Sequence, residues 1–261
     1  MGQFVKPVLT RGIRVLYSYF AWMRKYSKHP EKYPIELRYK KLHNLIKSVA
    51  HSFDIEYIVF GKENIPSSET CCFISNHISN FDPLAFLSVL DEPVAFVSKR
   101  EVEKFPFVGH CCKDIDCLFM DRNDLKQSLK VMGEVQNDLA NKNKNWLIFA
   151  EGTRNRDPLS AIRDMHHGTF RPAVRSGAVI VPVAIYGCQR ILRKKINFKK
   201  FPVFVSFLPA ISKEEYEKMT NQELAKMVHD QIQKELTFHL RPSDHEFNLK
   251  YNKKKYKFNQ V

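Results

Sequence analysis

The sequence predicts an α/β fold in which a mixed, largely buried sheet is flanked by helices and preceded by an amphipathic two-helix motif. From about Ile55 onward, short apolar runs of strand length alternate with segments of helical period, which is the pattern of layered α/β domains. The runs are mainly apolar, as expected for strands that are covered on both faces. With 261 residues, of which 44% are hydrophobic, the chain is long enough to bury a sizeable core.

Residues 1–53 are predicted to form two amphipathic, basic helices, and residues 54–261 the α/β domain with its C-terminal helix and basic tail. From Val5 to Met23 apolar residues recur at helical spacing, but cations interrupt the apolar runs, so this segment is not predicted to span a membrane. A second helix is predicted from about Pro34, because proline favours the first turn of a helix. In the first 53 residues, eleven Lys and Arg stand against two acidic residues.

Aromatic residues accompany these cations, and this combination is typical of helices that lie on a membrane surface. The alternative is a helical pair whose apolar stripe packs on the protein's own core, and the two interpretations are compatible. No secretory signal is predicted, so we expect a peripheral protein on the cytoplasmic face of a membrane, without a spanning helix. The residues predicted to bind the membrane are Lys6, Arg11, Arg14, Trp22, Arg24 and Lys25.

The predicted α/β part places its helices between apolar runs. A long helix is predicted from about Asn123 to Ala140 and another over 213–236, followed by a charged tail that we interpret as a solvated end. The apolar runs are, in chain order, "IEYIVFG", "CCFISN", "PLAFLSVL", "PVAFVSK", "CLFMDR", "NWLIFAEG", "VIVPVAIYG" and "FPVFVSFLPAI".

The chain is strongly basic, with 42 Lys and Arg against 28 Asp and Glu and a net charge of +14. This balance favours a polyanionic partner, which could be nucleic acid, an anionic membrane surface, or a phosphorylated or CoA-bearing substrate. Nucleic acid is not predicted, because the aromatic residues lie in apolar helices and strands and the sequence has no recognised nucleic-acid motif.

The six cysteines suit neither a disulfide framework nor a zinc pattern, so we predict reduced thiols and no metal. A metal cluster is conceivable in the segment "HCCKDIDC", His110 to Cys117. We do not predict one, because adjacent cysteines on a strand would point to opposite faces.

The stretch "FISNHISNFDP", Phe73 to Pro83, contains the first candidates for catalysis. Its apolar run would bring His77 to the carboxyl end of a strand, where open α/β sheets place their sites. Asp82 precedes Pro83, which is also the pattern of a helix N-cap, but this explains Asp82 and not His77. If the turn folds back, the Asp82 carboxylate accepts a hydrogen bond from one imidazole nitrogen and leaves the other to face substrate.

Polar residues also follow two other apolar runs. "LFMDR" puts Arg122 at one predicted strand end, and "FAEGTR" puts Glu151, Gly152 and Arg154 at another. Arginines in these positions suit a phosphate monoester, because the guanidinium fork matches phosphate oxygens and stays charged. Gly152 would let a ligand approach the backbone closely.

These segments together resemble the glycerolipid acyltransferase family, and most closely the bacterial 1-acylglycerol-3-phosphate acyltransferases. "NHISNFDP" matches the family's first block, N-H-x-S-x-x-D-P, without a gap, and "FMDR", "FAEGTR" and "VPVAI" match the next three in order. The segment "SKREVEKFPFVG", residues 98–109, resembles the Lys-containing stretch that the family has between its first two blocks. The resemblance covers roughly Ile55 to Leu208.

The resemblance implies roles for individual residues. His77 would be the general base, Asp82 would orient it and stabilise the imidazolium, and Pro182 would shape the acyl-donor side. A thioester is already activated, so base-assisted attack by a hydroxyl needs neither a metal nor a covalent acyl-enzyme. The residues implied in binding the glycerol phosphate of the acceptor are Lys99, Arg122, Glu151, Gly152, Thr153 and Arg154.

Three positions depart from the family's pattern. Ala150 and Asn155 replace a common Pro and a usual Ser of the third block, and both changes are conservative in role. His167 stands where a Lys before glycine is frequent, which leaves one contact to phosphate or CoA open. His166 and His167 are equally interpretable as surface residues.

The sequence thus predicts an acyltransferase of phospholipid biosynthesis. It would move a fatty acyl group from acyl-CoA or acyl-carrier protein to the sn-2 hydroxyl of lysophosphatidic acid, giving phosphatidic acid, with no cofactor beyond this co-substrate. The expected partners are an anionic membrane surface, lysophosphatidic acid and the thioester donor. Two alternatives stay open: an acyltransferase that acts on glycerol 3-phosphate or another lysophospholipid, and a non-enzymatic basic module that binds membranes.

Overall fold

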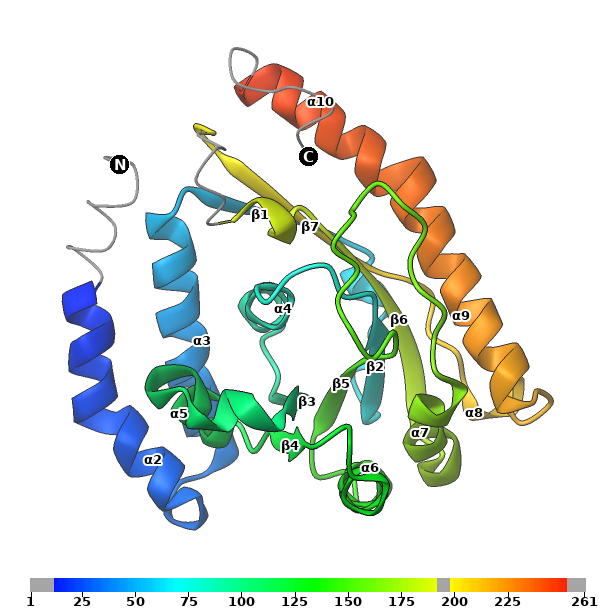
Figure 1. Cartoon of the computed structure of the whole chain (residues 1–261), viewed down its shortest axis with the longest axis horizontal. Coiled ribbons are helices and arrows are strands. Elements are labelled where there is room, and N and C mark those ends of the chain that lie inside the picture. Colours follow the sequence, from blue (N-terminus) through cyan, green and yellow to red (C-terminus); the bar gives the residue numbers. More distant parts are fainter. Residues whose placement is uncertain (1–11, 192–197, 253–261) are drawn as a thin grey trace.

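The computed structural model describes residues 12–191 and 198–252, and its centre is a seven-stranded sheet (Figure 1). The strand order is β1-β7-β6-β2-β5-β3-β4. Strands β6, β2, β5, β3 and β4 run parallel, whereas β7 pairs antiparallel with β6 and parallel with β1, so the sheet is mixed, as predicted. The strands are β1 (Ile55–Phe60), β2 (Cys71–Ser75), β3 (Val94–Lys99), β4 (Leu118–Met120), β5 (Asn145–Phe149), β6 (Val179–Tyr186) and β7 (Phe201–Phe207).

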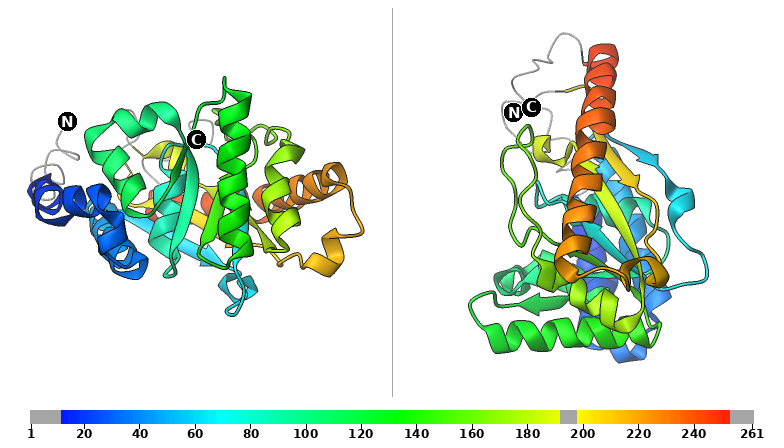
Figure 2. Two further views of the ribbon diagram at one scale, coloured as in Figure 1. Left: turned by 90° about the horizontal axis from the view of Figure 1, so that it is seen from below. Right: turned by 90° about the vertical axis from the view of Figure 1, so that its right-hand side faces the viewer.

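Each face of the sheet is covered by helices, because successive side chains along a strand point to opposite faces and both sets are apolar. Phe73 and Leu147 belong to the core beneath α3, α4 and α5, whereas Ile74 and Trp146 belong to the core beneath α6, α7 and α9. Figure 2 shows α9 and α10 continuing in one line beside the sheet. The helices are α3 (Ile35–Ser52), α4 (Asp82–Val89), α5 (Pro106–Asp114), α6 (Leu125–Ala140), α7 (Arg171–Ser176), α8 (Lys213–Tyr216), α9 (Asn221–Glu235) and α10 (Arg241–Tyr251).

The C-terminal helix predicted over 213–236 is interrupted and also runs further than expected. α8 is separate from α9, because Thr220 starts α9 with a capping box in which it and Glu223 exchange hydrogen bonds. Beyond α9 the helix continues through a π-helical turn, Leu236–Leu240 (η7), into α10.

The prediction that Cys111 and Cys112 lie on a strand is wrong. Both residues lie on α5, which has Pro106 in its first turn, a position that proline favours. The apolar run "PLAFLSVL" likewise forms most of α4, with Pro83 in the first turn. In the part of the chain that the structure describes, no group of three or more His, Cys, Asp or Glu could hold a metal ion.

The basic N-terminal segment is helical over residues 12–28, with a π-helical turn at Tyr19–Met23 (η1), and lies beside α3 (Figure 1). Met23 and Tyr39 belong to the same apolar cluster as Phe73, so these helices pack on the core of the sheet. The interpretation that their apolar stripe packs on the protein's own core therefore has direct support, and the division of the chain at residue 53 stays a prediction. None of the helices within the described residues is long and apolar enough to cross a membrane.

A buried cation joins α3 to the turn that precedes β4. Arg38, 5% exposed, donates to both carboxylate oxygens of Asp116 at 2.8 and 2.9 Å and to the backbone oxygen of Asp114 at 2.7 Å. The Asp114 side chain itself is fully buried, and neither of its oxygens has a hydrogen-bond partner among the described residues. Burial therefore raises the pKa of Asp114 from 3.8 to about 8, even though Arg38 opposes this shift.

Replacing Asp114 with Asn should flatten the pH dependence of stability. Because the pKa of Asp114 is about 8 in the folded chain and 3.8 for an ordinary aspartate, folding favours its protonated form. The free energy of unfolding of the wild type should therefore fall as the pH rises from about 4 to about 8, with a slope of up to about 1.4 kcal/mol per pH unit from this group. Urea unfolding at a series of pH values measures the slope.

The matched control is Asp164→Asn, at an exposed carboxylate. This control should keep the wild-type slope, and an Asp114→Asn variant with an unchanged slope would contradict the assignment.

Candidate active site

Four of the predicted site segments lie at one edge of the sheet. Strands β2, β5, β3 and β4 are parallel neighbours in that order, so their carboxyl ends meet at the same edge. His77 follows β2, Lys99 ends β3, Arg122 follows β4 and Glu151 follows β5. Chain segments that are up to 74 residues apart are thereby brought together where parallel sheets carry their sites.

His77 and Asp82 form a hydrogen-bonded pair. The Nδ1 atom of His77 lies 2.8 Å from Oδ2 of Asp82. The imidazole ring also stacks on the ring of Phe149, with centroids 4.2 Å apart and an angle of 24° between the planes. The His77 side chain is 14% exposed and that of Asp82 is fully buried. Because Asp82 uses Nδ1, Nε2 is the ring nitrogen that is available to a substrate.

Asp82 does not cap α4 in the way that the N-cap interpretation expected. Its Oδ2 atom accepts hydrogen bonds from the backbone N–H groups of Ile78 and Ser79 at 2.7 and 2.8 Å, so the carboxylate turns back toward the preceding turn. An N-cap side chain would instead accept from N–H groups further along the helix. Both backbone donors and the imidazole therefore hold the same oxygen, and this arrangement fixes the turn between β2 and α4.

The backbone of His77 is held on both sides by the loop that follows β5. Its N–H donates to Oε1 of Glu151 at 2.6 Å, and its carbonyl accepts from the N–H of Asn155 at 2.7 Å. The second oxygen of Glu151 accepts from the N–H of Arg163 at 2.9 Å. Burial raises the pKa of Glu151, although the two backbone donors and His77 act in the opposite direction. Glu151 is thus engaged with the backbone, and its implied contact to the acceptor stays a prediction.

Gly152 has a backbone conformation that only glycine adopts without strain. Its φ is +65°, and an added Cβ would lie 2.8 Å from Cδ2 and 2.9 Å from Nε2 of the His166 ring. His166 reaches this position because its N–H donates to the carbonyl of Ala150 at 2.9 Å. His166, one of the two histidines that the sequence left open as surface residues, therefore lies against the "FAEGTR" segment.

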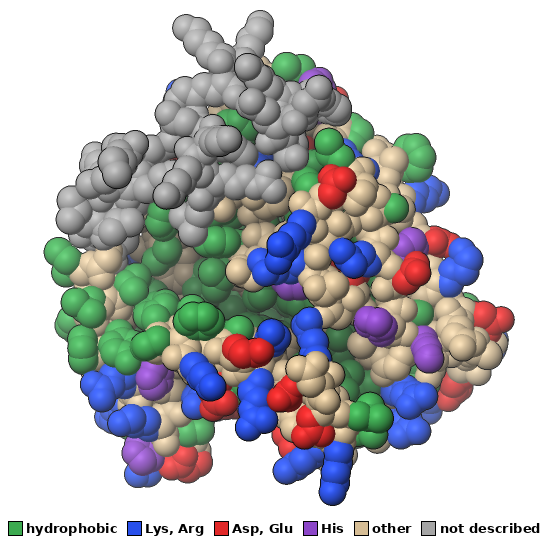
Figure 3. Space-filling model, viewed as in Figure 1, with side chains coloured by type: hydrophobic (Ala, Val, Ile, Leu, Met, Phe, Trp, Pro, Cys, Tyr) green, Lys and Arg blue, Asp and Glu red, His purple; other side chains and the backbone are tan. Residues whose placement is uncertain are grey.

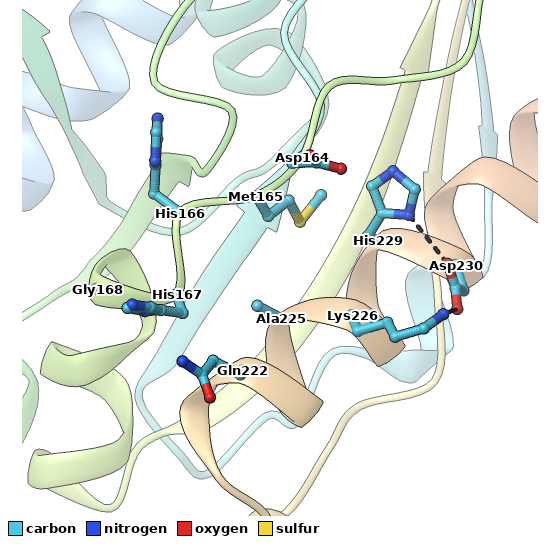
Figure 4. Close-up of a pocket in the computed structure, with 10 residues that line it drawn as sticks. All are labelled: Asp164, Met165, His166, His167, Gly168, Gln222, Ala225, Lys226, His229 and Asp230. Atoms are coloured by element: carbon cyan, nitrogen blue, oxygen red, sulfur yellow. Dashed lines mark hydrogen bonds and ion pairs between the residues drawn. The ribbon is translucent and has the colours of Figure 1, made fainter.

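His167 lines a separate surface groove of about 680 Å³ between residues 164–168 and α9 (Figure 4). The groove also includes His229, whose Nδ1 lies 3.0 Å from Asp230. His77 and Asp82 are not among its lining residues. The groove therefore adds no group to the His77–Asp82 pair.

Asn76 is a site residue that the sequence reasoning did not identify. It is fully buried, its side-chain amide donates to the carbonyl of Ile185 at 2.9 Å, and its side-chain carbonyl accepts from the N–H of Ile185 at 2.8 Å. The Asn76 side chain thus makes the two hydrogen bonds that a backbone N–H and C=O would otherwise make, and it continues the pairing of β2 with β6 beyond Ser75. The sequence contained one signal for this role: Asn76 directly precedes His77, and its side chain has both a hydrogen-bond donor and an acceptor.

The remaining predicted residues are placed as follows. Lys99 is exposed and pairs with Glu101 at 2.6 Å, Arg122 is exposed, and Arg154 is half-buried. Thr153 lines a hollow of about 530 Å³ together with Glu151. Pro182 is buried within β6, where it pairs in register with Ile74 of β2. Their roles toward substrate stay predictions, and Lys6 and Arg11 lie outside the described residues.

The buried thiol of Cys188 lies close to the carboxylate of Asp82. Cys188 follows β6 and is fully buried. Burial raises the pKa of this thiol well above its usual value, and the negative charge of Asp82 raises it further. Cys188 is therefore a neutral thiol rather than a nucleophile, in agreement with the interpretation of the cysteines from the sequence.

Comparisons with known proteins agree with this geometry. The family model described as Acyltransferase matches residues 56–186, which is half of the chain, so the chain belongs to the acyltransferase family. The predicted family and the predicted enzyme class are thereby confirmed.

The relatives have more specific names. A protein of Mycoplasma pneumoniae named as a probable 1-acyl-sn-glycerol-3-phosphate acyltransferase is 28% identical over 202 residues, which cover 75% of this chain and 74% of the relative. The Escherichia coli 1-acyl-sn-glycerol-3-phosphate acyltransferase is 29% identical over 156 residues, which cover 59% of this chain and 61% of the relative. The crystal structure of the 1-acyl-sn-glycerophosphate acyltransferase PlsC from Thermotoga maritima has the same fold, with a TM-score of 0.66 and 22% identity over 89% of this chain and 90% of that one.

Gly152→Ala should destabilise the chain and displace His166. The substitution forces a side chain into the left-handed region and into contact with the imidazole, so we expect a loss of about 1–2 kcal/mol in the free energy of unfolding. Urea unfolding measures the loss. Gly168→Ala is the matched control, because an added Cβ there meets nothing within 4 Å. Equal effects of the two substitutions would contradict the strain argument.

Proposed function

We propose that this protein transfers a fatty acyl group from a thioester, acyl-CoA or acyl-carrier protein, to the sn-2 hydroxyl of 1-acylglycerol 3-phosphate, giving phosphatidic acid. The observation that carries the proposal is the pairing of His77 with a buried Asp82 at the carboxyl edge of the sheet. The names of the relatives from Mycoplasma pneumoniae and Escherichia coli, a probable and a named 1-acyl-sn-glycerol-3-phosphate acyltransferase, support this choice of acceptor.

The proposed reaction needs one base and no covalent intermediate on the protein. Nε2 of His77 takes the proton of the acceptor hydroxyl while the hydroxyl oxygen attacks the thioester carbonyl carbon. The tetrahedral intermediate collapses as the carbon–sulfur bond breaks, and the leaving thiolate takes the proton back from the imidazolium. Asp82 keeps Nδ1 protonated and offsets the positive charge of the imidazolium.

We assign the acceptor phosphate to the basic residues at the same edge of the sheet. Arg122 and Arg154 can each offer a guanidinium fork to phosphate oxygens, and Lys99 lies at the end of the neighbouring strand β3. Thr153 would face the glycerol, and Gly152 would let the loop pass close to the His166 ring. Glu151 would act by holding the backbone of His77, and Pro182 would shape the donor side.

We also propose that the basic N-terminal helices hold the enzyme on an anionic membrane surface, where its acceptor resides. Arg14, Arg24, Lys25 and Trp22 belong to the described part of these helices. Each Lys or Arg close to such a surface contributes about 1 kcal/mol, and buried apolar side chains add to this. On the face in Figure 3, hydrophobic side chains gather at the left, where Figure 1 places residues 12–28, α3 and α5.

The acceptor could instead be glycerol 3-phosphate or a lysophospholipid with a larger headgroup. Each of these compounds offers a free hydroxyl to the thioester. They differ in the headgroup that the basic residues at the carboxyl edge of the sheet must accommodate. Parallel assays with the three acceptors separate the alternatives. A non-enzymatic role is disfavoured by the family and by the hydrogen bond between His77 and the buried Asp82.

His77→Ala should lower acyl transfer by about 10²–10⁴-fold, because the substitution removes the general base. Release of free thiol from a long-chain acyl-CoA, with lysophosphatidic acid in detergent, measures the rate. Acyl-carrier protein replaces CoA if the wild type is inactive with CoA. His167→Gln, on the groove beside α9, is the control and should keep most of the rate. Equal rates for the wild type and His77→Ala would refute the mechanism.

Arg122→Lys should raise the KM for lysophosphatidic acid by about tenfold with a smaller change in kcat. Lysine keeps the charge but loses the two-pronged geometry that matches phosphate, a difference of roughly 1–2 kcal/mol. Initial rates at varied acceptor concentration measure both constants. Lys126→Gln, at an exposed position on α6, is the control. A fall in kcat at unchanged KM would contradict a binding role for Arg122.

A further inference from the structure

A groove of about 480 Å³ runs between the N-terminal helix and α3, and the proposed reaction does not use it. The two helices lie side by side (Figure 1), and their contacts show that they run in opposite directions. Arg14 bonds Ser48 near the end of α3, whereas Lys41, nearer its start, lies over the ring of Tyr26. The lining residues are Arg14, Tyr17, Ser18, Ala21, Trp22, Lys41, Asn44 and Leu45.

The described residues that line this groove give it a positive charge. Among them are two cations, Arg14 and Lys41, and no carboxylate. Nη1 of Arg14 donates to Oγ of Ser48 at 2.9 Å, which orients the guanidinium and leaves its other N–H groups for a ligand. Nζ of Lys41 lies 5.2 Å from the ring centroid of Tyr26, an interaction that leaves its three N–H donors available. The groove therefore has the donors for a phosphate and nothing that repels one.

The neighbouring surface is apolar and exposed. Ile13, Leu16, Tyr17 and Phe20 are on the same helix as Arg14, and they are 74%, 58%, 71% and 62% exposed. Exposed apolar side chains at this density on one short helix indicate a partner surface rather than scattered positions. Trp22 and Tyr17, which line the groove, are the residue types that prefer the level of lipid headgroups.

We propose that this groove binds the phosphate-bearing headgroup of an anionic glycerophospholipid, whose acyl chains lie along the apolar side chains of residues 13–20. The phosphate lies between Arg14 and Lys41, and the side-chain amide of Asn44 serves the polar part of the headgroup. This site rests on the proposed membrane location of the enzyme. It shares no residue with the acceptor-binding edge of the sheet, so it fixes how the enzyme sits on the bilayer and does not take part in the reaction.

The tryptophans of the chain provide a direct measurement. The sequence has two of them: Trp22 lines the groove, and Trp146 is fully buried in the core. We would titrate the full-length protein with dioctanoyl phosphatidylglycerol below its critical micelle concentration and follow tryptophan emission. We expect a saturable change that is absent with dioctanoyl phosphatidylcholine and absent in a Trp22→Phe variant. Equal responses to the two lipids would overturn the proposal.

Paired substitutions separate the groove from the general positive charge. Arg14→Gln with Lys41→Gln should raise the Kd for dioctanoyl phosphatidylglycerol at least tenfold, or abolish saturation. Lys32→Gln with Lys40→Gln removes the same two charges at exposed positions outside the groove and should leave the Kd within about twofold of the wild type, because short-range contacts outweigh screened surface charge. Equal losses in the two double variants would mean that net charge alone attracts the lipid, and the headgroup site would be rejected.

Acyl transfer by the wild type, assayed with lysophosphatidic acid in detergent, distinguishes this inference from the proposed reaction. Active enzyme without saturable lipid binding would refute the groove and leave the reaction standing. Saturable lipid binding without acyl transfer from either acyl-CoA or acyl-carrier protein would refute the proposed reaction and would still support the headgroup site in the groove. Thermal unfolding of both double variants verifies that they remain folded, as expected for substitutions of exposed side chains.

Discussion

Three donors converge on one buried oxygen, Oδ2 of Asp82: the His77 imidazole and the backbone N–H groups of Ile78 and Ser79. A carboxylate without exposure to water is costly unless such donors surround it. The turn between β2 and α4 must therefore adopt the one conformation in which all three donors reach the same atom. That conformation also decides where the imidazole points and which ring nitrogen Asp82 engages.

The same turn depends on the neighbouring strand. β2 and β5 are adjacent, and the loop after β5 holds the backbone of His77 through Glu151 on one side and Asn155 on the other. Gly152 can pass close beneath His166 in this loop because it has no Cβ. Two sequence blocks that are far apart in the chain thus form one hydrogen-bonded unit, and the proposed base and the proposed acceptor contacts are built on it.

The sequence was sufficient for the fold class and for the edge of the sheet where the site lies, because strand ends can be located from apolar runs. It also suggested the His77–Asp82 contact, since the two residues are five positions apart in one turn. It could not assign Glu151 to backbone amides or find the role of Asn76. Those contacts depend on which strands become neighbours, across separations of 74 and 109 residues.

Local signals that were present in the sequence also outweighed the apolar pattern in two places. Pro106 starts a helix at the adjacent cysteines, for which we expect a strand from the sequence, and Thr220 starts α9 anew within residues 213–236, which the apolar period predicts as one helix. The exposure of Ile13, Leu16, Tyr17 and Phe20 was equally hidden, because an amphipathic pattern does not reveal whether its apolar side meets the core or solvent.

The two-sided hold on His77 restricts how this scaffold can be redesigned. A library that varies the loop after β5 to admit a new acceptor would also shift His77, the proposed base, so gains in selectivity from that loop would come with losses in turnover. Within the part of the chain that the structure describes, the segment after β4 makes no hydrogen bond to the His77 backbone, and its Arg122 is exposed. Directed evolution toward other phosphorylated alcohols should therefore accumulate its first useful changes around β4, and changes in the β5 loop only after compensating ones.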